Sequence, residues 1–248
     1  MGKNHYHKDY SIIVPAYNEE VCLPETLKIL NRIVKAVPQK GEIIVANNNS
    51  TDRTEEIARE YGAEVVFEGH RQIACSRNAG AKISRANYLF FVDADTFINK
   101  KLFLACLHLL GSGDVCGGGA LARFSPGSSN DRLMRSLVTM WDFLSRRFKW
   151  ACGAYVFCRR DAFVDIGGFD ERFYASEEIH FSRSLKKWGK KNKMQFVILD
   201  QYIETSPRKL QWFGVWRMLK MNLPVMLCPY LLRSRRFCRM WYTRPQGK

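Results

Sequence analysis

Short apolar runs and longer amphipathic segments alternate through the first hundred residues. The apolar runs have the length of strands and lie at 10–15, 42–46, 63–67 and 88–92. Segments with helical spacing separate them, at 20–37, 53–61 and 72–83. Strands that alternate with helices in this order predict a parallel sheet with helices on its faces. The expected fold class is therefore α/β, with a mostly parallel central sheet.

The rhythm of the pattern is looser in the second half of the chain. Apolar spacing there favours helices at 99–110 and 132–148 and strands at 115–124 and 151–158. Another helix is expected from Glu177, because Phe181, Leu185 and Trp188 recur at i, i+4 and i+7 and define one apolar face. No internal repeat or linker interrupts the chain, so we expect one domain over residues 1–248.

Asp93 and Asp95 are the most informative residues of the chain. They follow residues 88–92, a continuous apolar and aromatic run that is typical of a strand buried on both faces. Open α/β sheets bind their ligands at the carboxyl ends of the strands. Carboxylates in such a place need a counter-charge, and Mg²⁺ typically takes one or two of them together with substrate phosphates. The pair therefore predicts a site for a divalent cation and a phosphorylated ligand; the alternative is a loop with two solvated acids.

The first predicted strand runs into the turn Pro15-Ala16-Tyr17-Asn18-Glu19. A turn that proline restrains, followed by an aromatic ring, an amide and a carboxylate, can bind a nucleotide through its base and its ribose hydroxyls. The alternative is an ordinary turn in which Asn18 caps the next helix and Glu19 lies in the first turn of that helix, where the helix dipole favours an acid.

The balance of charges restricts the partners of the chain. Thirty-nine Lys and Arg residues against 24 Asp and Glu give a net charge of +15. Such a chain is attracted to nucleic acid, to an anionic membrane surface or to phosphorylated substrates. No recognisable nucleic-acid-binding module accompanies the charge, so we expect no nucleic-acid partner.

The cysteines and the start of the chain bear on the compartment. The eight cysteines include no Cys-x-x-Cys pair and several lie inside apolar runs, which favours buried, reduced thiols over a disulfide framework or a zinc site. Residues 1–9 are polar and contain no apolar segment typical of a secretory signal. We therefore expect a cytoplasmic protein.

Five ordered motifs resemble family 2 of the inverting glycosyltransferases, which have the GT-A fold. The motifs read SIIVPAYNEE, EIIVANNNSTDRT, RNAG, YLFFVDADT and IGGFDERFYASEE, and the similarity extends from about residue 10 to residue 189. The resemblance implies a Rossmann-like GT-A sheet and the transfer of a sugar from a UDP- or GDP-linked donor to a hydroxyl acceptor. It also implies Mg²⁺ or Mn²⁺ as the cofactor. Residues 10–98 would then bind the donor, and residues 99–210 would bind the acceptor and carry the catalytic group.

The same resemblance implies roles for particular residues. In the family the Asp-x-Asp motif binds the metal, so Asp95 is the expected direct ligand and Asp93 lies against metal and nucleotide. The expected nucleotide-binding residues of the other motifs are Ala16, Tyr17, Glu19, Asn48 and Arg77, the last on the pyrophosphate side. The family usually carries a carboxylate where this chain has Asn47 or Asn48. The base, uracil or guanine, is therefore left open.

Glu177 and Glu178 are the first residues of the helix expected from Glu177. From the N-terminus of that helix, we expect their side chains to point into a pocket above the sheet. The family reads Glu-Asp at this position, and the second acid is the general base that deprotonates the acceptor hydroxyl. Glu178 aligns with that acid, and Glu177 remains the alternative. The pair could also be structural, because acids at a helix N-terminus favour the helix dipole.

Arg208 and Lys209 follow a predicted turn at Pro207. They lie where relatives carry active-site residues, so they are candidates for contact with the diphosphate. A solvated basic turn is the alternative interpretation.

The tail, residues 211–248, combines Trp, Tyr, Leu and Met with Arg and Lys, and Pro224 and Pro229 interrupt its apolar part. These features make it a poor transmembrane span. They suit an interfacial helical segment on anionic lipid, at the inner face of the cell membrane, where a lipid-linked acceptor would be available. The alternative is a pair of helices that pack on the domain, and the two can hold together on opposite faces.

Two other functions use some of the same features. A nucleotidyl- or phosphoryl-transferase would need the metal carboxylates, but the chain lacks a Walker-type glycine-rich loop. A non-catalytic, membrane-associated nucleotide-sugar-binding protein would leave Glu177 and Glu178 structural. Residues 117–122 formally match the dinucleotide pattern G-x-G-x-x-A, and we interpret these glycines as the floor of the sugar or acceptor pocket.

Overall fold

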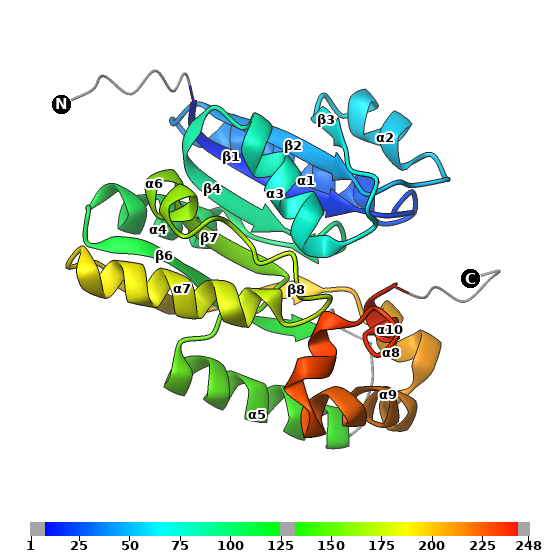
Figure 1. The fold of residues 1–248 in the computed structure, drawn as a ribbon. Coiled ribbons are helices and arrows are strands. Elements are labelled where there is room, and N and C mark those ends of the chain that lie inside the picture. Colours follow the sequence, from blue (N-terminus) through cyan, green and yellow to red (C-terminus); the bar gives the residue numbers. More distant parts are fainter. Residues whose placement is uncertain (1–7, 125–131, 243–248) are drawn as a thin grey trace.

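The computed structural model describes residues 8–124 and 132–242, which form a mixed sheet covered by helices (Figure 1). The order of the eight strands in the sheet is β3-β2-β1-β4-β7-β6-β8-β5. The strands are β1 (Lys8–Ala16), β2 (Gly41–Asn47), β3 (Glu64–Phe67), β4 (Ala86–Val92), β5 (Thr96–Phe97), β6 (Val115–Phe124), β7 (Tyr155–Arg159) and β8 (Gln195–Thr205). The helices are α1 (Leu23–Ala36), α2 (Thr54–Glu60), α3 (Ile73–Ile83), α4 (Lys100–Gly111), α5 (Arg132–Phe148), α6 (Arg160–Asp165), α7 (Glu177–Lys191), α8 (Arg208–Phe213), α9 (Val215–Leu227), the 3₁₀ helix η1 (Pro229–Arg233) and α10 (Arg239–Tyr242).

The first half of the chain has the architecture that the apolar pattern predicts. β1 pairs in parallel with β2 and with β4, and β2 pairs in parallel with β3. Helices α1, α2 and α3 connect these strands in the expected order. The α/β fold class with a mostly parallel central sheet is confirmed.

The second half differs from the expected pattern in how its strands pair. β7 lies between β4 and β6 and is antiparallel to both, whereas β6 and β8 are parallel. The sequence pattern did not predict β8, the two-residue β5 or α6. β8 is mostly half-buried, so its alternation of apolar and polar residues is weak. β5 depends on antiparallel pairing with β8, a contact between residues far apart in the chain.

Two aromatic clusters, one on each face of the sheet, form the core. Successive residues of a strand point to opposite faces, so Phe90 and Phe91 of β4 belong to different clusters. Phe90 packs with Phe103 of α4, at 4.6 Å between ring centroids, on the face that α1, α2 and α4 cover. Phe91 packs edge-on against Phe169, at 4.9 Å, on the face that α3, α6 and α7 cover.

The glycines of residues 117–119 lie inside the sheet and do not form the floor of a pocket, which corrects that interpretation. A Cβ on Gly118 would lie 2.2 Å from the carbonyl oxygen of Val197, and one on Gly119 would lie 2.7 Å from the Cβ of Ala151. Glycine is required there because neighbouring backbone and side chains leave no space for a side chain.

The C-terminal segment returns to the sheet as short helices. Val225 of α9 and Cys238 pack against Ala175, in the loop that precedes α7. The expectation that the tail packs on the domain therefore holds for its described part, and residues 243–248 lie outside it. Five of the eight cysteines are buried, as the sequence predicts: Cys75, Cys106, Cys116, Cys158 and Cys238. Across residues 8–124 and 132–242, no helix has the length and apolar content that crossing a bilayer demands.

Candidate active site

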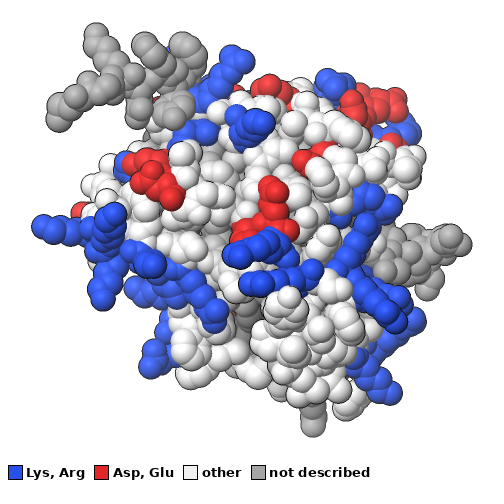
Figure 2. Space-filling model, viewed as in Figure 1, with Lys and Arg blue, Asp and Glu red and all other residues white. Residues whose placement is uncertain are grey.

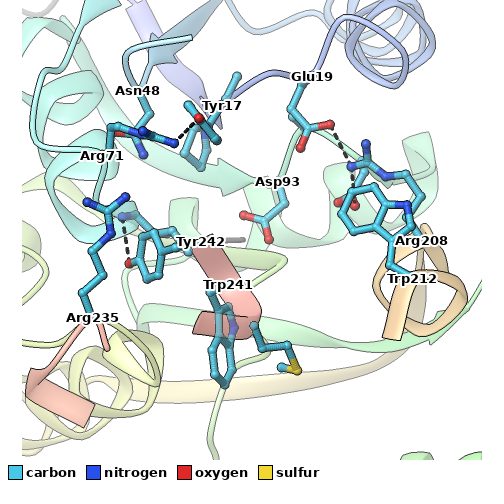
Figure 3. A pocket seen from close by; sticks show the side chains of 16 residues that line it. Tyr17, Glu19, Asn48, Arg71, Asp93, Arg208, Trp212, Arg235, Trp241 and Tyr242 are labelled. Atoms are coloured by element: carbon cyan, nitrogen blue, oxygen red, sulfur yellow. Dashed lines mark hydrogen bonds and ion pairs between the residues drawn. The ribbon is translucent and has the colours of Figure 1, made fainter. Parts of the chain in front are cut away.

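A pocket lies where the carboxyl ends of β1, β2 and β4 meet the C-terminal segment (Figure 3). Parallel strands bring their carboxyl ends to one edge of the sheet, so residues far apart in the chain share this edge. The residues that line the pocket are Pro15, Ala16, Tyr17, Glu19, Asn48, Arg71, Ile73, Asp93, Ala94, Asp95, Arg208, Trp212, Arg235, Met240, Trp241 and Tyr242. Of the predicted nucleotide and metal residues, Asn18 and Arg77 do not line it; the predicted bases, Glu177 and Glu178, are also not among its lining residues.

Hydrogen bonds hold the loops after β1 and β2 against each other. Asn18 adopts a positive φ of 51°, its backbone N–H donates to Ser50, and its side-chain oxygen accepts from the N–H of Thr51 at 2.8 Å. The backbone N–H of Glu19 donates to Thr54 at 2.8 Å. Helix α1 begins only at Leu23, so the alternative of Asn18 as its cap is wrong. Asn18 therefore does not line the pocket but holds together the two loops that do.

One end of the pocket is suited to a planar base. The guanidinium of Arg71 lies over the ring of Tyr17, 4.2 Å from its centroid, and hydrogen-bonds its hydroxyl. The side-chain oxygen of Asn48 accepts the backbone N–H of Gln72 at 3.1 Å, an arrangement that fixes the orientation of the amide. Asn47 instead donates to Glu55 at 2.8 Å and does not line the pocket. Of the two asparagines, Asn48 is therefore the one that lines the pocket.

The other end of the pocket joins three charged side chains. Arg208 donates to Glu19 at 2.7 Å and to Asp95 at 3.0 Å. Pairing of β5 with β8 brings this arginine near Asp95, because Thr96 pairs with Thr205. The two carboxylates raise the pKa of Arg208 against the opposing effect of burial. Figure 3 shows Glu19 and Arg208 on one side of Asp93, with Tyr17 and Asn48 on the other.

Arg77 lies beneath the pocket, with a side chain that is 2% exposed. It donates to Glu177 at 2.6 Å, to Asp93 at 3.1 Å and to the carbonyl oxygen of Gly153 at 2.7 Å. Arg77 itself does not line the pocket, although its partner Asp93 does, and its expected place on the pyrophosphate side of a ligand stays a prediction. Arg77 compensates two carboxylates, and it connects the first turn of α7 to the end of β4.

Glu178 is half-buried beside this arginine, whereas Glu177 is buried and forms an ion pair with it. A Cβ on Gly153 would lie 3.4 Å from the carboxyl carbon of Glu178 and 3.5 Å from Nη2 of Arg77, so both groups adjoin that glycine. Burial, followed by repulsion from Glu177, raises the pKa of Glu178 to about 8 despite the attraction of Arg77. A carboxylate that holds its proton near neutral pH is suited to acid–base chemistry.

Asp93 and Asp95 have the chemistry that a hard divalent cation requires. Each carboxylate has one oxygen in a pair with an arginine, Arg77 for Asp93 and Arg208 for Asp95. Among the described residues, no cluster of three or more His, Cys, Asp or Glu side chains could by itself hold a metal ion. Two carboxylates suffice where phosphate oxygens and water complete the coordination, as is usual for Mg²⁺. The residues present therefore fit Mg²⁺ or Mn²⁺ bound together with a diphosphate.

Besides Ile73 and Ala94, sequence reasoning missed six lining residues: Arg71, Trp212, Arg235, Met240, Trp241 and Tyr242. Arg71 lies just before α3, and no sequence motif marks it as a binding residue. The remaining five belong to the tail, whose aromatic and basic composition was interpreted as a membrane segment or as packing. Tyr242 packs on Tyr174 at 5.7 Å, and its hydroxyl oxygen accepts from the N–H of Ile73 at 3.5 Å. These contacts place the end of the tail against the pocket.

Comparisons of sequence identify the family of the chain. Residues 11–171 match the family described as "Glycosyl transferase family 2". An uncharacterised glycosyltransferase of Bacillus subtilis, EpsJ, is 32% identical over 98 residues, which are 38% of this chain and 28% of EpsJ. The glycosyltransferase AglE of Haloferax volcanii is 27% identical over 185 residues, 70% of this chain and 60% of AglE. The 4,4'-diaponeurosporenoate glycosyltransferase of Staphylococcus haemolyticus is 38% identical over 100 residues, 37% of this chain and 25% of that enzyme.

Solved structures share the fold at low sequence identity. The mannosyltransferase PcManGT from Pyrobaculum calidifontis, in complex with GDP-Man and Mn²⁺, superposes with a TM-score of 0.65 at 15% identity, covering 96% of this chain and 74% of PcManGT. S. aureus TarS in complex with UDP-GlcNAc gives a TM-score of 0.63 at 18% identity, covering 93% and 74%. The chain thus spans from about a quarter to three fifths of the length of the sequence relatives above.

Proposed function

The chain belongs to glycosyl transferase family 2, and on that basis we propose that it transfers a sugar from a nucleoside-diphosphate donor to a hydroxyl acceptor, with inversion at the anomeric carbon. The observation that carries the proposal is the pocket at the carboxyl ends of β1, β2 and β4. Tyr17 and Asn48 line the end that is suited to a planar base. The charged end is lined by Asp93, Asp95 and Arg208. This order of groups matches a base, a ribose and a diphosphate laid along one sheet edge.

Asp95 and Asp93 are the proposed ligands of Mg²⁺ or Mn²⁺. Such a cation neutralises charge on a departing diphosphate as a Lewis acid. The presence of Mn²⁺ with GDP-Man in PcManGT supports this proposal. Arg208 lies between Glu19 and Asp95 and can place a second positive charge on the diphosphate. Which nucleotide the chain takes stays open, because TarS was solved with UDP-GlcNAc and PcManGT with GDP-Man.

Glu178 is the proposed general base. Its carboxylate would take the proton of the acceptor hydroxyl while that oxygen attacks the anomeric carbon, opposite the departing nucleoside diphosphate. Glu177 is engaged with Arg77 at 2.6 Å and has a structural position. Arg77 also pairs with Asp93, so one buried cation holds the helix of the base in register with the metal-binding turn.

The acceptor and the compartment are finer proposals. We propose a lipid-linked hydroxyl or a precursor of a cell-envelope glycan, on a protein that works in the cytoplasm. The name of the 4,4'-diaponeurosporenoate glycosyltransferase supports an apolar acceptor, although the match covers 37% of this chain.

The products of the reaction test the proposed function against its two rivals. The protein is incubated with Mn²⁺ and a panel of UDP- and GDP-sugars, with and without candidate acceptors, and nucleotides are separated by chromatography. A glycosyltransferase releases UDP or GDP. Release of a nucleoside monophosphate or of inorganic phosphate would indicate a nucleotidyl- or phosphoryl-transferase, and binding without any release would indicate a sensor of nucleotide-sugars.

A further inference from the structure

Large apolar side chains are exposed mainly on two helices of the described structure. Phe143 of α5 is 65% exposed, and Trp216 and Leu227 of α9 are 72% and 78% exposed. Met140 on α5 and Leu223 on α9 are also exposed. On each helix these side chains recur at the spacing of one stripe. Figure 1 shows α5 and α9 at the same end of the molecule, below the sheet.

The same end of the molecule is strongly cationic. Residues 205–242 contain eight Lys and Arg and no Asp or Glu. In Figure 2 the lower part of the molecule is blue and white, and the red side chains lie above it. A groove between α9 and the segment after η1 combines the two kinds of side chain; it is lined by Lys220, Met221, Pro224, Arg236, Phe237 and Arg239. We call this groove, with Met140, Phe143, Trp216, Leu223 and Leu227, the α5–α9 face.

We propose that the α5–α9 face docks on a lipid bilayer that carries anionic headgroups. Exposed Trp and Leu side chains enter the boundary between headgroups and acyl chains, and Lys and Arg around them attract the negative surface. The three cations of the groove, Lys220, Arg236 and Arg239, suit headgroup phosphates. A second copy of the chain would bring two cationic faces together, and a nucleic acid would leave the apolar stripe exposed, so the bilayer is the partner that both features fit.

The inner side of the same segment contacts the active site. Tyr174 donates its backbone N–H to the carbonyl oxygen of Leu232 at 2.8 Å. Tyr174 lies two residues before Ser176, the residue that directly precedes α7. Trp241 and Tyr242 line the pocket itself. Docking would therefore hold the segment that forms one wall of the pocket at the membrane surface, where a lipid-linked acceptor would lie. This last point rests on the proposed function, whereas docking does not.

Vesicle sedimentation tests the docking surface with the full chain. Wild type is mixed with phosphatidylcholine vesicles, with and without phosphatidylglycerol, at low and at high salt. We expect binding to the anionic vesicles alone and its loss as salt shortens the Debye length below about 10 Å. Binding to both kinds of vesicle equally, or to neither, would overturn the proposal.

Two sets of variants locate the surface. The charge set should lower the partition coefficient by about two orders of magnitude at low salt. It combines Lys220→Ser, Arg236→Ser and Arg239→Ser. The apolar set should lower it by roughly tenfold or more. It combines Phe143→Ser, Trp216→Ser and Leu227→Ser.

Each set has a control of equal size on another surface. The charge control combines Lys190→Ser, Lys191→Ser and Lys193→Ser, all exposed at the end of α7. The apolar control combines Val21→Ser, Phe67→Ser and Val164→Ser, all exposed. A control set that loses as much binding as its partner would show attraction by net charge or general stickiness and would overturn the α5–α9 face. A dimer on size-exclusion chromatography that these variants abolish would also overturn it, in favour of a second copy.

Nucleotide release separates this proposal from the proposed function. The variants of the α5–α9 face should release nucleotide from a soluble nucleotide-sugar at the wild-type rate, because none of their residues lines the pocket. If wild type binds anionic vesicles and releases no nucleotide from any donor, docking stands and the proposed function fails.

Discussion

Glu177 and Glu178 are neighbours in the chain, yet their surroundings differ, and we propose a structural role for Glu177 and the role of general base for Glu178. Glu177 is buried in an ion pair with Arg77 at 2.6 Å, whereas Glu178 adjoins that arginine across Gly153. We expect Glu178→Gln to lower kcat by roughly 10²–10⁴-fold, because a positioned base contributes about that much, with nucleotide affinity near that of wild type. Glu177→Gln is the companion variant; it weakens the buried pair with Arg77 and so should lower stability, but it should lower kcat less than Glu178→Gln does. Steady-state kinetics and nucleotide titration measure both, and a loss of kcat confined to Glu177→Gln would move the base by one position.

The raised pKa of Glu178 also predicts a pH profile. A general base acts in its deprotonated form, and burial raises the pKa of this carboxyl to about 8. The rate should therefore be low at acidic pH and rise as pH increases towards 8, in place of levelling off near the usual pKa of Glu, about 4.3. The pH dependence of kcat for wild type tests this. A flat profile from pH 5 to 8 would contradict the assigned base.

Arg77 predicts an effect on stability as well as on activity. Removal of one partner from a buried ion pair costs about 3–5 kcal/mol, since it leaves uncompensated charge. Arg77→Ala leaves the buried Glu177 without its partner and also removes the pair with Asp93, which is 34% exposed, so it should lower the free energy of unfolding by about 3–5 kcal/mol. Denaturant unfolding measures it. Arg53→Ala, which breaks an exposed pair with Glu56, is the control and should change stability little.

At the scale of elements, the C-terminal helices contribute a wall that lies outside the matched family segment, residues 11–171. Trp241 of α10 lines the pocket, whereas Trp216 of α9 is exposed away from it. Trp241→Ala should weaken nucleotide or nucleotide-sugar binding by roughly three- to tenfold, the usual value of one aromatic contact. Trp216→Ala is its matched control and should bind as wild type. Isothermal titration gives both constants, and equal affinities for the two variants would remove α10 from the binding site.

At the scale of the whole molecule, the pocket is shared by the first-half strands and the C-terminal segment, so its ligand should stabilise the entire fold. A ligand at a hundred times its Kd adds about 2.7 kcal/mol to the free energy of unfolding. We expect Mn²⁺ and UDP or GDP together to raise Tm by several degrees, and either alone to raise it less, because the cation and the diphosphate complete each other's coordination.

Removal of the metal supplies the control for that shift. EDTA should cancel the joint effect and abolish turnover, and Asp95→Ala should behave in the same way with Mn²⁺ present. An Asp95→Ala protein that keeps the full thermal shift and the wild-type rate would exclude Asp95 as a metal ligand.

Local pattern was sufficient for much of the fold. The apolar runs that became β1, β2 and β4 specify buried parallel strands by themselves, because a strand covered on both faces must be apolar throughout. The ends of those strands then place Tyr17, Asn48 and Asp95 at one edge, a consequence of parallel topology that needs no knowledge of side-chain contacts.

The sequence alone thus determined the α/β class, the family resemblance and the sheet edge that carries the site. Tertiary structure decided the contacts between distant segments: Arg77 with Glu177 and Asp93, Arg208 with Glu19 and Asp95, and the end of the tail against the pocket. No periodicity encodes these contacts, because they depend on antiparallel pairing of β5 with β8 and on packing across a hundred residues or more. The raised pKa of Glu178 also depends on the folded structure, because burial is its largest cause and outweighs the attraction of the distant Arg77.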